Sequence, residues 1–448
     1  MKIAVIGASH AGIACALRAR EEYPEANITL YEKQKSIGFV AQSIPLYLMG
    51  DNDFLKVSSY TSVRELEEKG IRVFTETVVR CVDTQKKELT YVSKNSEQSQ
   101  SDFYDKLVLA TGSYPSLPLA AGDFHKDLFM LKEFADAKKI KRLIETAKTL
   151  IIIGGGAIGI ELARVLKQNE VHAILLQSHE ILLNRYLDDE PASIVRKSLE
   201  EEGIEVYTSA VTTNIREEAR QTIVTTEDGK SYTADGVVYA TGFRPNSFLV
   251  HSQVALGDKG AILVDDYMRT SEKDVFAIGD CSTTSVTHLR EPIYIPHASD
   301  AFRQGEIAAL NLLGKRRKIS SSQGTYNLNF GEKTLCMTGL SHRRAKEEGY
   351  NSAIAYCRNQ YLNSEKYNEM WLIYEKGTHE ILGLQVRGTA EEISSYADIV
   401  SLALQEKMSI EDLEFADFYF RHGYANPRSF AKILADIVRR QDPKKDGE

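Results

Sequence analysis

The sequence predicts an α/β protein with two similar parallel-sheet domains, followed by an α+β domain at the C-terminus. The pair of similar domains is predicted because an apolar strand, a glycine-rich turn and a helix follow one another from residue 3, and the same order recurs from residue 150. The last domain is predicted because charge, serine and glycine replace the apolar pattern at 314–324. We therefore expect a domain boundary near residue 320.

The first glycine-rich turn has the spacing of a dinucleotide-binding motif. An apolar strand at 3–6 leads into GASHAG at 7–12 and a helix, and a second strand at 28–31 is followed by Glu32. Gly7 allows the tight turn, and the helix N-terminus presents backbone N–H groups to a pyrophosphate. Glu32 is expected to hold a ribose hydroxyl. The motif is weak by itself, because serine replaces its middle glycine.

A second copy of the motif strengthens this interpretation. The strand at 150–153 runs into GGGAIG at 154–159, and two copies in one chain predict two dinucleotides. Each copy is followed by an apolar strand that ends in Ala-Thr-Gly, where small residues let the backbone turn close to a cofactor. A further strand ends in Gly279 and Asp280, whose carboxylate can accept a hydrogen bond from a ribityl hydroxyl. This last feature predicts FAD rather than a second nicotinamide nucleotide.

The sequence also predicts where each domain begins and ends. The FAD domain is expected to be discontinuous, at 1–113 and 235–320, with the NAD(P) domain inserted at 114–234 and a C-terminal domain at 321–448. The residues expected to bind the cofactors are Gly7, Ser9, His10, Gly12, Glu32, Ala110, Thr111, Gly112, Gly154, Gly156, Gly159, Gln177, Gly242, Gly279, Asp280 and Ala298.

Composition excludes several classes of protein. Hydrophobic residues make up 43% of the 448 residues, which is ample for sizeable cores, and the formal net charge of −8 gives no reason to expect nucleic-acid binding. The five cysteines are scattered without a Cys-x-x-Cys pair, so neither a disulfide centre nor a metal site is expected. No run approaches the length of a membrane span. We expect a cytoplasmic protein.

These motifs together resemble one family. The chain is similar, over essentially its whole length, to the NADH oxidase, NADH peroxidase and coenzyme A-disulfide reductase group of the pyridine nucleotide-disulfide oxidoreductases. The most specific matches are GASH at 7–10, YMRTS at 267–271 leading to Gly279 and Asp280, and MSIEDL at 408–413 with ADF at 416–418. The resemblance implies bound FAD, NAD(P)H as reductant and a homodimer formed by the C-terminal domain.

One position departs from this group. The loop at 39–48 is similar to the one that places a redox cysteine beside the flavin, but Gln42 stands where that cysteine is expected. An amide cannot cycle through sulfenic acid, which disfavours peroxidase, disulfide-reductase and water-forming activity. We therefore expect a two-electron oxidase or diaphorase that reduces O2 to H2O2. The alternatives are a reductase of a small electron carrier or a quinone, and a non-catalytic FAD or coenzyme A redox sensor.

Four residues are candidates for catalysis. The resemblance places Glu161 near the nicotinamide end of the flavin, although it is also suited to a first helical turn. His10 would polarise bound oxygen species with Gln42 nearby, or would only form hydrogen bonds near the FAD pyrophosphate. Tyr424 would reach the partner's flavin, or would only pack at the dimer interface.

The nucleotide preference depends on the end of the strand that follows the second motif. Gln177 occupies the position where an acid is expected to bind the adenosine ribose, and no arginine follows at 178–180. Loss of the carboxylate removes the repulsion that excludes a 2′-phosphate, but no side chain replaces it with an attraction. We expect tolerance of both NADH and NADPH.

Overall fold

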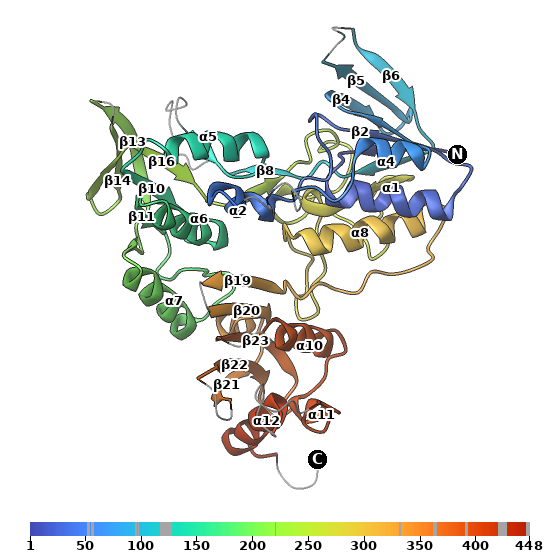
Figure 1. The fold of residues 1–448 in the computed structure, drawn as a ribbon. Coiled ribbons are helices and arrows are strands. Elements are labelled where there is room, and N and C mark those ends of the chain that lie inside the picture. The colour runs from blue at the N-terminus through green and yellow to red at the C-terminus, as the bar shows by residue number, and fades with distance from the viewer. Residues whose placement is uncertain are drawn as a thin grey trace. The chain divides into compact units, whose positions relative to one another are not determined.

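The structure is a computed structural model that describes residues 1–51, 54, 58–94, 96, 98–116, 128–219, 221–330, 333–361, 365–389, 393–419 and 428–444. The chain divides into two compact units, whose elements are labelled in Figure 1. The first unit consists of Met1–Glu180, Lys197–Thr284 and Pro292–Ser320. The second consists of Ile181–Arg196, Ser285–Glu291 and Ser321–Glu448. The finer division of the first unit into FAD and NAD(P) domains stays a prediction.

The first motif lies in a five-stranded parallel sheet with the strand order β18-β7-β1-β2-β3. Its strands are β1 (Lys2–Ile6), β2 (Asn27–Tyr31), β3 (Ile71–Phe74), β7 (Lys106–Leu109) and β18 (Val275–Ala277). Helices α1 (His10–Glu22) and α8 (Ala298–Asn311) pack against each other beside it. The continuous burial of residues 3–6 in β1 is typical of a parallel strand covered on both faces.

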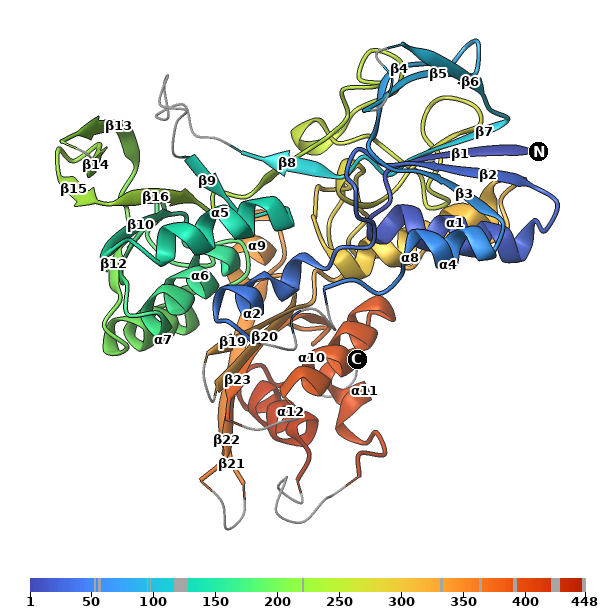
Figure 2. The ribbon, with the colours of Figure 1, turned by 45° about the horizontal axis from the view of Figure 1, so that its top comes forward.

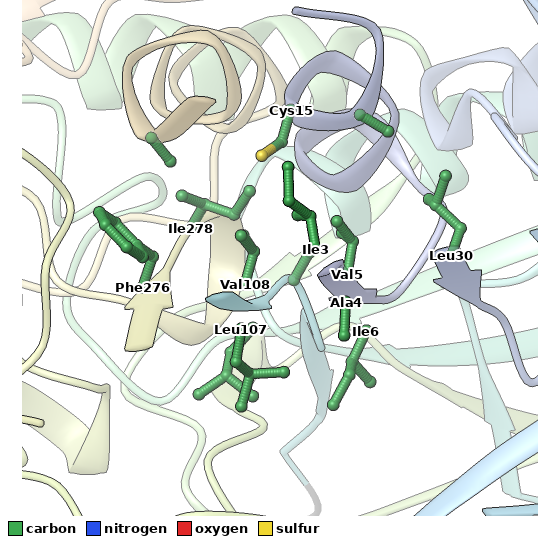
Figure 3. Close-up of a cluster of buried hydrophobic side chains, with 14 of the residues drawn as sticks. Ile3, Ala4, Val5, Ile6, Cys15, Leu30, Leu107, Val108, Phe276 and Ile278 are labelled. Atoms are coloured by element: carbon green, nitrogen blue, oxygen red, sulfur yellow. The ribbon is translucent and has the colours of Figure 1, made fainter. Parts of the chain in front are cut away.

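The core of this sheet explains why its strands are almost entirely apolar. Val5 of β1 pairs with Val108 of β7, so their side chains lie on the same face. Figure 3 shows Ile3, Val5 and Val108 directed toward the helices, together with Cys15 from α1, whereas Leu107 points to the opposite face. Both faces of the sheet are therefore packed with aliphatic side chains.

The second motif lies in another five-stranded parallel sheet, with the order β12-β11-β10-β16-β9. Its strands are β9 (Leu128–Met130), β10 (Thr149–Ile153), β11 (His172–Leu176), β12 (Glu205–Tyr207) and β16 (Gly236–Tyr239). Its helices include α5 (Phe134–Ile144) and α6 (Ala157–Gln168). The order β10, α6, β11 repeats the order β1, α1, β2, which confirms the two copies predicted from the sequence.

Smaller elements complete the first unit. Two antiparallel sheets are formed by β4 (Thr77–Asp83), β5 (Glu88–Ser93) and β6 (Gln100–Phe103), and by β13 (Thr212–Glu218), β14 (Gln221–Thr226) and β15 (Ser231–Ala234). A two-stranded antiparallel ribbon is formed by β8 (Ser113–Pro115) and β17 (Phe243–Pro245). Two short helices, α2 (Ile44–Leu48) and α4 (Val63–Glu68), follow the first motif in the chain.

The second unit is built on a five-stranded antiparallel sheet with the order β19-β20-β23-β22-β21. Its elements are β19 (Tyr326–Phe330), β20 (Lys333–Gly339), β21 (Ser352–Gln360), β22 (Tyr367–Glu375), β23 (Ile381–Gly388), α9 (His342–Glu347), α10 (Ile393–Gln405), α11 (Ile410–Glu414) and α12 (Phe430–Gln441), and α7 (Asp189–Glu201) begins in this unit. Figure 2 shows α10 and α12 beside the sheet, and their apolar side chains share one core with it.

This architecture confirms the α/β class and the α+β character of the C-terminal region. Among the described residues, no helix is both long enough and apolar enough to cross a membrane.

Candidate active site

The first glycine-rich turn is shaped by two close backbone approaches. Gly7 has a φ of +108°, and a Cβ built on it would lie 2.1 Å from the carbonyl oxygen of Ala110 at the end of β7. A Cβ on Gly12 would lie 1.9 Å from the carbonyl oxygen of Gly7. Only hydrogen fits at these positions. The absence of side chains there lets the first turn of α1 pack directly against the glycine-rich turn. Ser9 is the N-cap of α1 and makes no side-chain capping bond.

This turn fits the pyrophosphate of a dinucleotide. The first N–H groups of a helix have no intrahelical acceptor, and the helix dipole favours an anion there. Glu32, at the carboxyl end of β2, is buried and accepts hydrogen bonds from the N–H groups of Ala8 and Gln34, both at 2.8 Å. Burial raises the pKa of Glu32, and the two N–H donors oppose that shift. The carboxylate is thereby held beside the turn, as expected for a ribose ligand.

The second turn repeats this geometry closely. Gly154 has a φ of +120°, and a Cβ on it would lie 2.4 Å from the carbonyl oxygen of Ala240. A Cβ on Gly159 would lie 1.9 Å from the carbonyl oxygen of Gly154. Gly156 is the N-cap of α6, with open space around its Cα. Gln177, buried at the end of β11, accepts a hydrogen bond from the N–H of Gly155 at 3.0 Å.

Asp280 is the centre of a polar cluster in the first site. It follows Gly279, whose φ is +70° and whose N–H donates to Oε1 of Gln304 at 2.6 Å. The hydroxyl of Ser113 donates to Oδ2 of Asp280 at 2.8 Å. Nζ of Lys132 donates to the same hydroxyl and lies 3.9 Å from Oδ2 of Asp280.

Lys132 has a lower pKa than is usual for a lysine. Burial lowers its pKa to about 8, and the negative charge of Asp280 only partly opposes this shift. Its Nζ also lies 4.7 Å from the ring centroid of Phe243. A lysine with this pKa can hold or release a proton near neutral pH.

His10 lies near the same carboxylate. It is the first residue of α1, and burial lowers its pKa while the charge of Asp280 opposes that shift. Its ring stacks on Tyr60, with 5.6 Å between the ring centroids and an angle of 8° between the planes. His10 and Asp280, which are 270 residues apart in the chain, therefore belong to one site.

The two Ala-Thr-Gly turns lie beside the β8–β17 ribbon. The hydroxyl of Thr111 donates to the carbonyl of Asn246 at 2.5 Å, and the N–H of Asn246 donates to the carbonyl of Gly112 at 2.9 Å. In the second turn, the carbonyl of Gly242 accepts from the N–H of Ser116 at 2.9 Å. Ala298, also predicted to bind cofactor, is the first residue of α8.

The remaining catalytic candidates differ in their environments. Gln42 is exposed, in a 3-10 turn at Ala41–Ser43 that is closed by a hydrogen bond from the hydroxyl of Ser43 to the carbonyl of Val40 at 2.6 Å. Glu161, in α6, is half-buried, and burial raises its pKa to about 7. Tyr424 lies outside the described residues, so its role stays a prediction.

The cysteines do not supply a redox centre by another route. All five are free, and only Cys81 is exposed. Cys281 follows Asp280, but its buried thiol donates to the carbonyls of Leu109 and Ile278, both at 3.3 Å. In the part of the chain that the structure describes, no group of three or more His, Cys, Asp or Glu side chains is placed to hold a metal ion.

Sequence reasoning missed several polar residues that complete the first site. Lys132 and Ser113 contact Asp280, Tyr60 contacts His10, and Gln304 contacts Gly279. None of them stands in a recognisable motif, and each contact joins residues that are distant in the chain.

The two glycine-rich turns, each at the end of a parallel strand and the start of a helix, define a protein that binds two dinucleotides. Residues 1–305 match the family described as pyridine nucleotide-disulphide oxidoreductase. The NADH oxidase of Enterococcus faecalis is 31% identical over 451 residues, covering 98% of this chain and 99% of that protein.

Solved structures agree with this match. The water-forming NADH oxidase from Lactobacillus brevis bound to NADH has a TM-score of 0.95 at 28% identity, covering 98% of each chain. An engineered water-forming NADPH oxidase bound to NADPH has a TM-score of 0.95 at 28% identity, covering 98% of this chain and 99% of that one.

This chain therefore belongs to the pyridine nucleotide-disulphide oxidoreductase family. It is a flavoprotein enzyme with FAD and a nicotinamide nucleotide as cofactors, as is typical of this family. The family predicted from the sequence motifs is confirmed.

Proposed function

We propose that the chain is an NAD(P)H oxidase that reduces O2 to H2O2. The reaction balances as NAD(P)H + H⁺ + O2 → NAD(P)⁺ + H2O2. When bound, FAD supplies the two-electron chemistry, accepting hydride from the nicotinamide and passing electrons to oxygen. The observation that carries the choice of product is Gln42, at the position where the resemblance expects a redox cysteine.

The residues of the first site supply binding and proton handling. The turn at 7–12 binds the pyrophosphate through backbone N–H groups, and Glu32 and Asp280 accept hydrogen bonds from sugar hydroxyls. Lys132 is half-buried and can donate the proton consumed in the reaction, because its pKa is about 8. Burial lowers the pKa of His10, so its neutral imidazole can accept or relay a proton, and the positive charge of the cluster near neutral pH is that of Lys132.

The second site supplies the reductant. Its turn at 154–159 binds the pyrophosphate of the nicotinamide nucleotide, and Gln177 presents an uncharged side chain toward the ribose. The engineered NADPH oxidase carries five substitutions, among which an aspartate is replaced by alanine and an alanine by arginine. This chain likewise has no carboxylate at residue 177, but it has no arginine at 178–180. This combination supports use of both nucleotides.

The test is the yield of H2O2 for each NADH consumed by purified, FAD-loaded protein in air, with the flavin spectrum recorded simultaneously. Equimolar peroxide is the expected result. Rapid flavin reduction under argon with negligible oxygen turnover would replace the proposal with a carrier or quinone reductase. Absence of flavin reduction by either nucleotide would favour the sensor.

The role of position 42 can be tested separately. Gln42→Cys introduces a thiol that can form sulfenic acid, so we expect a lower peroxide yield per NADH than in the wild type. Gln42→Ser is the matched control, because a hydroxyl cannot follow the same redox cycle. Equal peroxide yields from both variants and the wild type would show that residue 42 does not determine the product.

A further inference from the structure

Three consecutive residues, Lys132, Glu133 and Phe134, lead into the N-terminus of α5 and contact three other segments of the chain. Lys132 contacts Ser113 and Asp280, as described above. The carboxylate of the next residue, Glu133, accepts from Nζ of Lys33 at 3.0 Å and from Nε2 of Gln34 at 2.6 Å. These two partners directly follow Glu32 in the chain. The third residue is Phe134, whose contacts lead to the loop of Gln42.

Phe134 is the central member of an aromatic cluster. The cluster, called here the aromatic clamp, consists of Phe39, Tyr47, Phe54 and Phe134. The ring of Phe134 lies 5.9 Å from that of Phe39, 5.0 Å from that of Tyr47 and 5.2 Å from that of Phe54, measured between centroids. Phe134 thus contacts every other member of the clamp.

The clamp holds both sides of the exposed turn that carries Gln42. Phe39 precedes this turn, and Tyr47 follows it in α2. Figure 2 shows α2 close to α5, and the two helices are in contact. Nζ of Lys141, in α5, donates to the carbonyl of Tyr47 at 3.2 Å and lies 4.4 Å from its ring centroid. Within the turn, Ala41 and Gln42 are exposed and Ser43 is buried. The N–H of Val40 also donates to the carbonyl of Ser58 at 2.9 Å, so the clamp is one of the contacts that hold this loop.

We infer that Phe134 is a positioning residue, which holds the Gln42 loop in a fixed relation to the Lys132–Asp280 pair. Phe134 is the first residue of α5, and Lys132 lies two residues before it in the same continuous segment. A shift of the loop relative to α5 therefore changes the distance between residue 42 and the cation. The inference rests on the proposed function only in assigning the loop to the flavin site.

The test compares Phe134→Ala with Phe134→Leu in the FAD-loaded full-length protein. We expect Phe134→Ala to increase iodide quenching of flavin fluorescence, because the loop is no longer held against α5. Its kcat for NADH oxidation in air should fall roughly ten- to a hundredfold, with a much smaller change in KM for NADH. Phe134→Leu fills most of the same volume and should recover most of both properties.

A second variant keeps the inference testable if Phe134→Ala does not fold. Lys141→Met removes the cation and its hydrogen bond to Tyr47 but keeps an apolar chain of similar length. We expect changes in the same direction but smaller. Lys139→Met is the matched control, since Lys139 is exposed on the same helix and is not part of the clamp. It should behave as the wild type.

The outcomes separate this inference from the proposed function. If iodide quenching and kcat of Phe134→Ala equal those of the wild type, the positioning role is refuted. The same conclusion follows if Lys141→Met and Lys139→Met are indistinguishable. If the wild type makes no peroxide, the oxidase proposal fails, but the quenching comparison still decides whether Phe134 positions the loop.

Discussion

The two dinucleotide-binding turns share one backbone geometry and differ in one charge. In the first, Glu32 accepts from the N–H of Ala8 at 2.8 Å. In the second, Gln177 accepts from the N–H of Gly155 at 3.0 Å. In both turns a side-chain oxygen accepts a hydrogen bond from a backbone N–H of the turn. An amide oxygen does this as well as a carboxylate, so a carboxylate is not needed to complete the turn. We propose that the charge at this position influences which ribose substituents are accepted.

The largest effects are expected when a methyl group is added to the first glycine of each turn. Gly7→Ala and Gly154→Ala each place a Cβ within 2.4 Å of a carbonyl oxygen and require a strained positive φ. We expect Gly7→Ala to lose FAD, and Gly154→Ala to retain FAD but lose reduction by NADH. Flavin content and anaerobic reduction measure the two effects. Gly229→Ala, at a positive φ in open space, controls for backbone strain alone.

The contribution of Lys132 to the first site can be tested through the pH dependence of kcat and through substitution. Its pKa of about 8 means that its positive charge is present below that pH and is lost above it. If the cation assists the reaction, kcat falls as pH rises through about 8, and Lys132→Met lowers kcat at neutral pH by about a hundredfold. Lys132→Arg should keep activity to higher pH, because arginine remains charged. This role would be contradicted if the kcat of the wild type stayed constant up to pH 10 and the Lys132→Met variant remained fully active.

Introducing a negative charge at the second turn tests what determines the preference for NADH or NADPH. Gln177→Glu reproduces the carboxylate of Glu32 in the same hydrogen-bonded position, which should repel a 2′-phosphate. We expect the ratio of kcat/KM for NADH to that for NADPH to rise on the order of tenfold. Steady-state kinetics with both nucleotides measure this ratio, and Gln177→Ala controls for loss of the native side chain. An unchanged ratio would remove residue 177 from the determinants of preference.

The smallest expected effect concerns Glu161, the half-buried acid of the second site. The pKa of Glu161 in the folded chain is about 7, above its ordinary value of 4.5. Between these values the folded state binds more protons than the unfolded state, so stability falls as pH rises through this window. The slope is at most about 1.4 kcal/mol per pH unit. Glu161→Gln should flatten it in denaturant titrations of the apoprotein, whereas an unchanged slope would assign it to other groups.

The sequence predicted much of the fold because glycine spacing and apolar runs are local signals. The strands at 3–6 and 150–153 and their turns are confirmed as β1 and β10 with the glycines at their ends. The polar cluster was only half predicted. Asp280 stands in a motif, but Lys132 reaches it through packing between segments 148 residues apart, and no local pattern encodes such a contact.

The environment of the thiols bears on the proposed release of peroxide. Burial raises the pKa of Cys15, Cys336 and Cys357 to about 12, and also raises that of Cys281. Peroxide attacks thiolates, and thiols with such pKa values remain protonated. Of the five thiols, only that of Cys81 is exposed. If peroxide is the product, as proposed, we expect it to oxidise Cys81 before the four buried thiols.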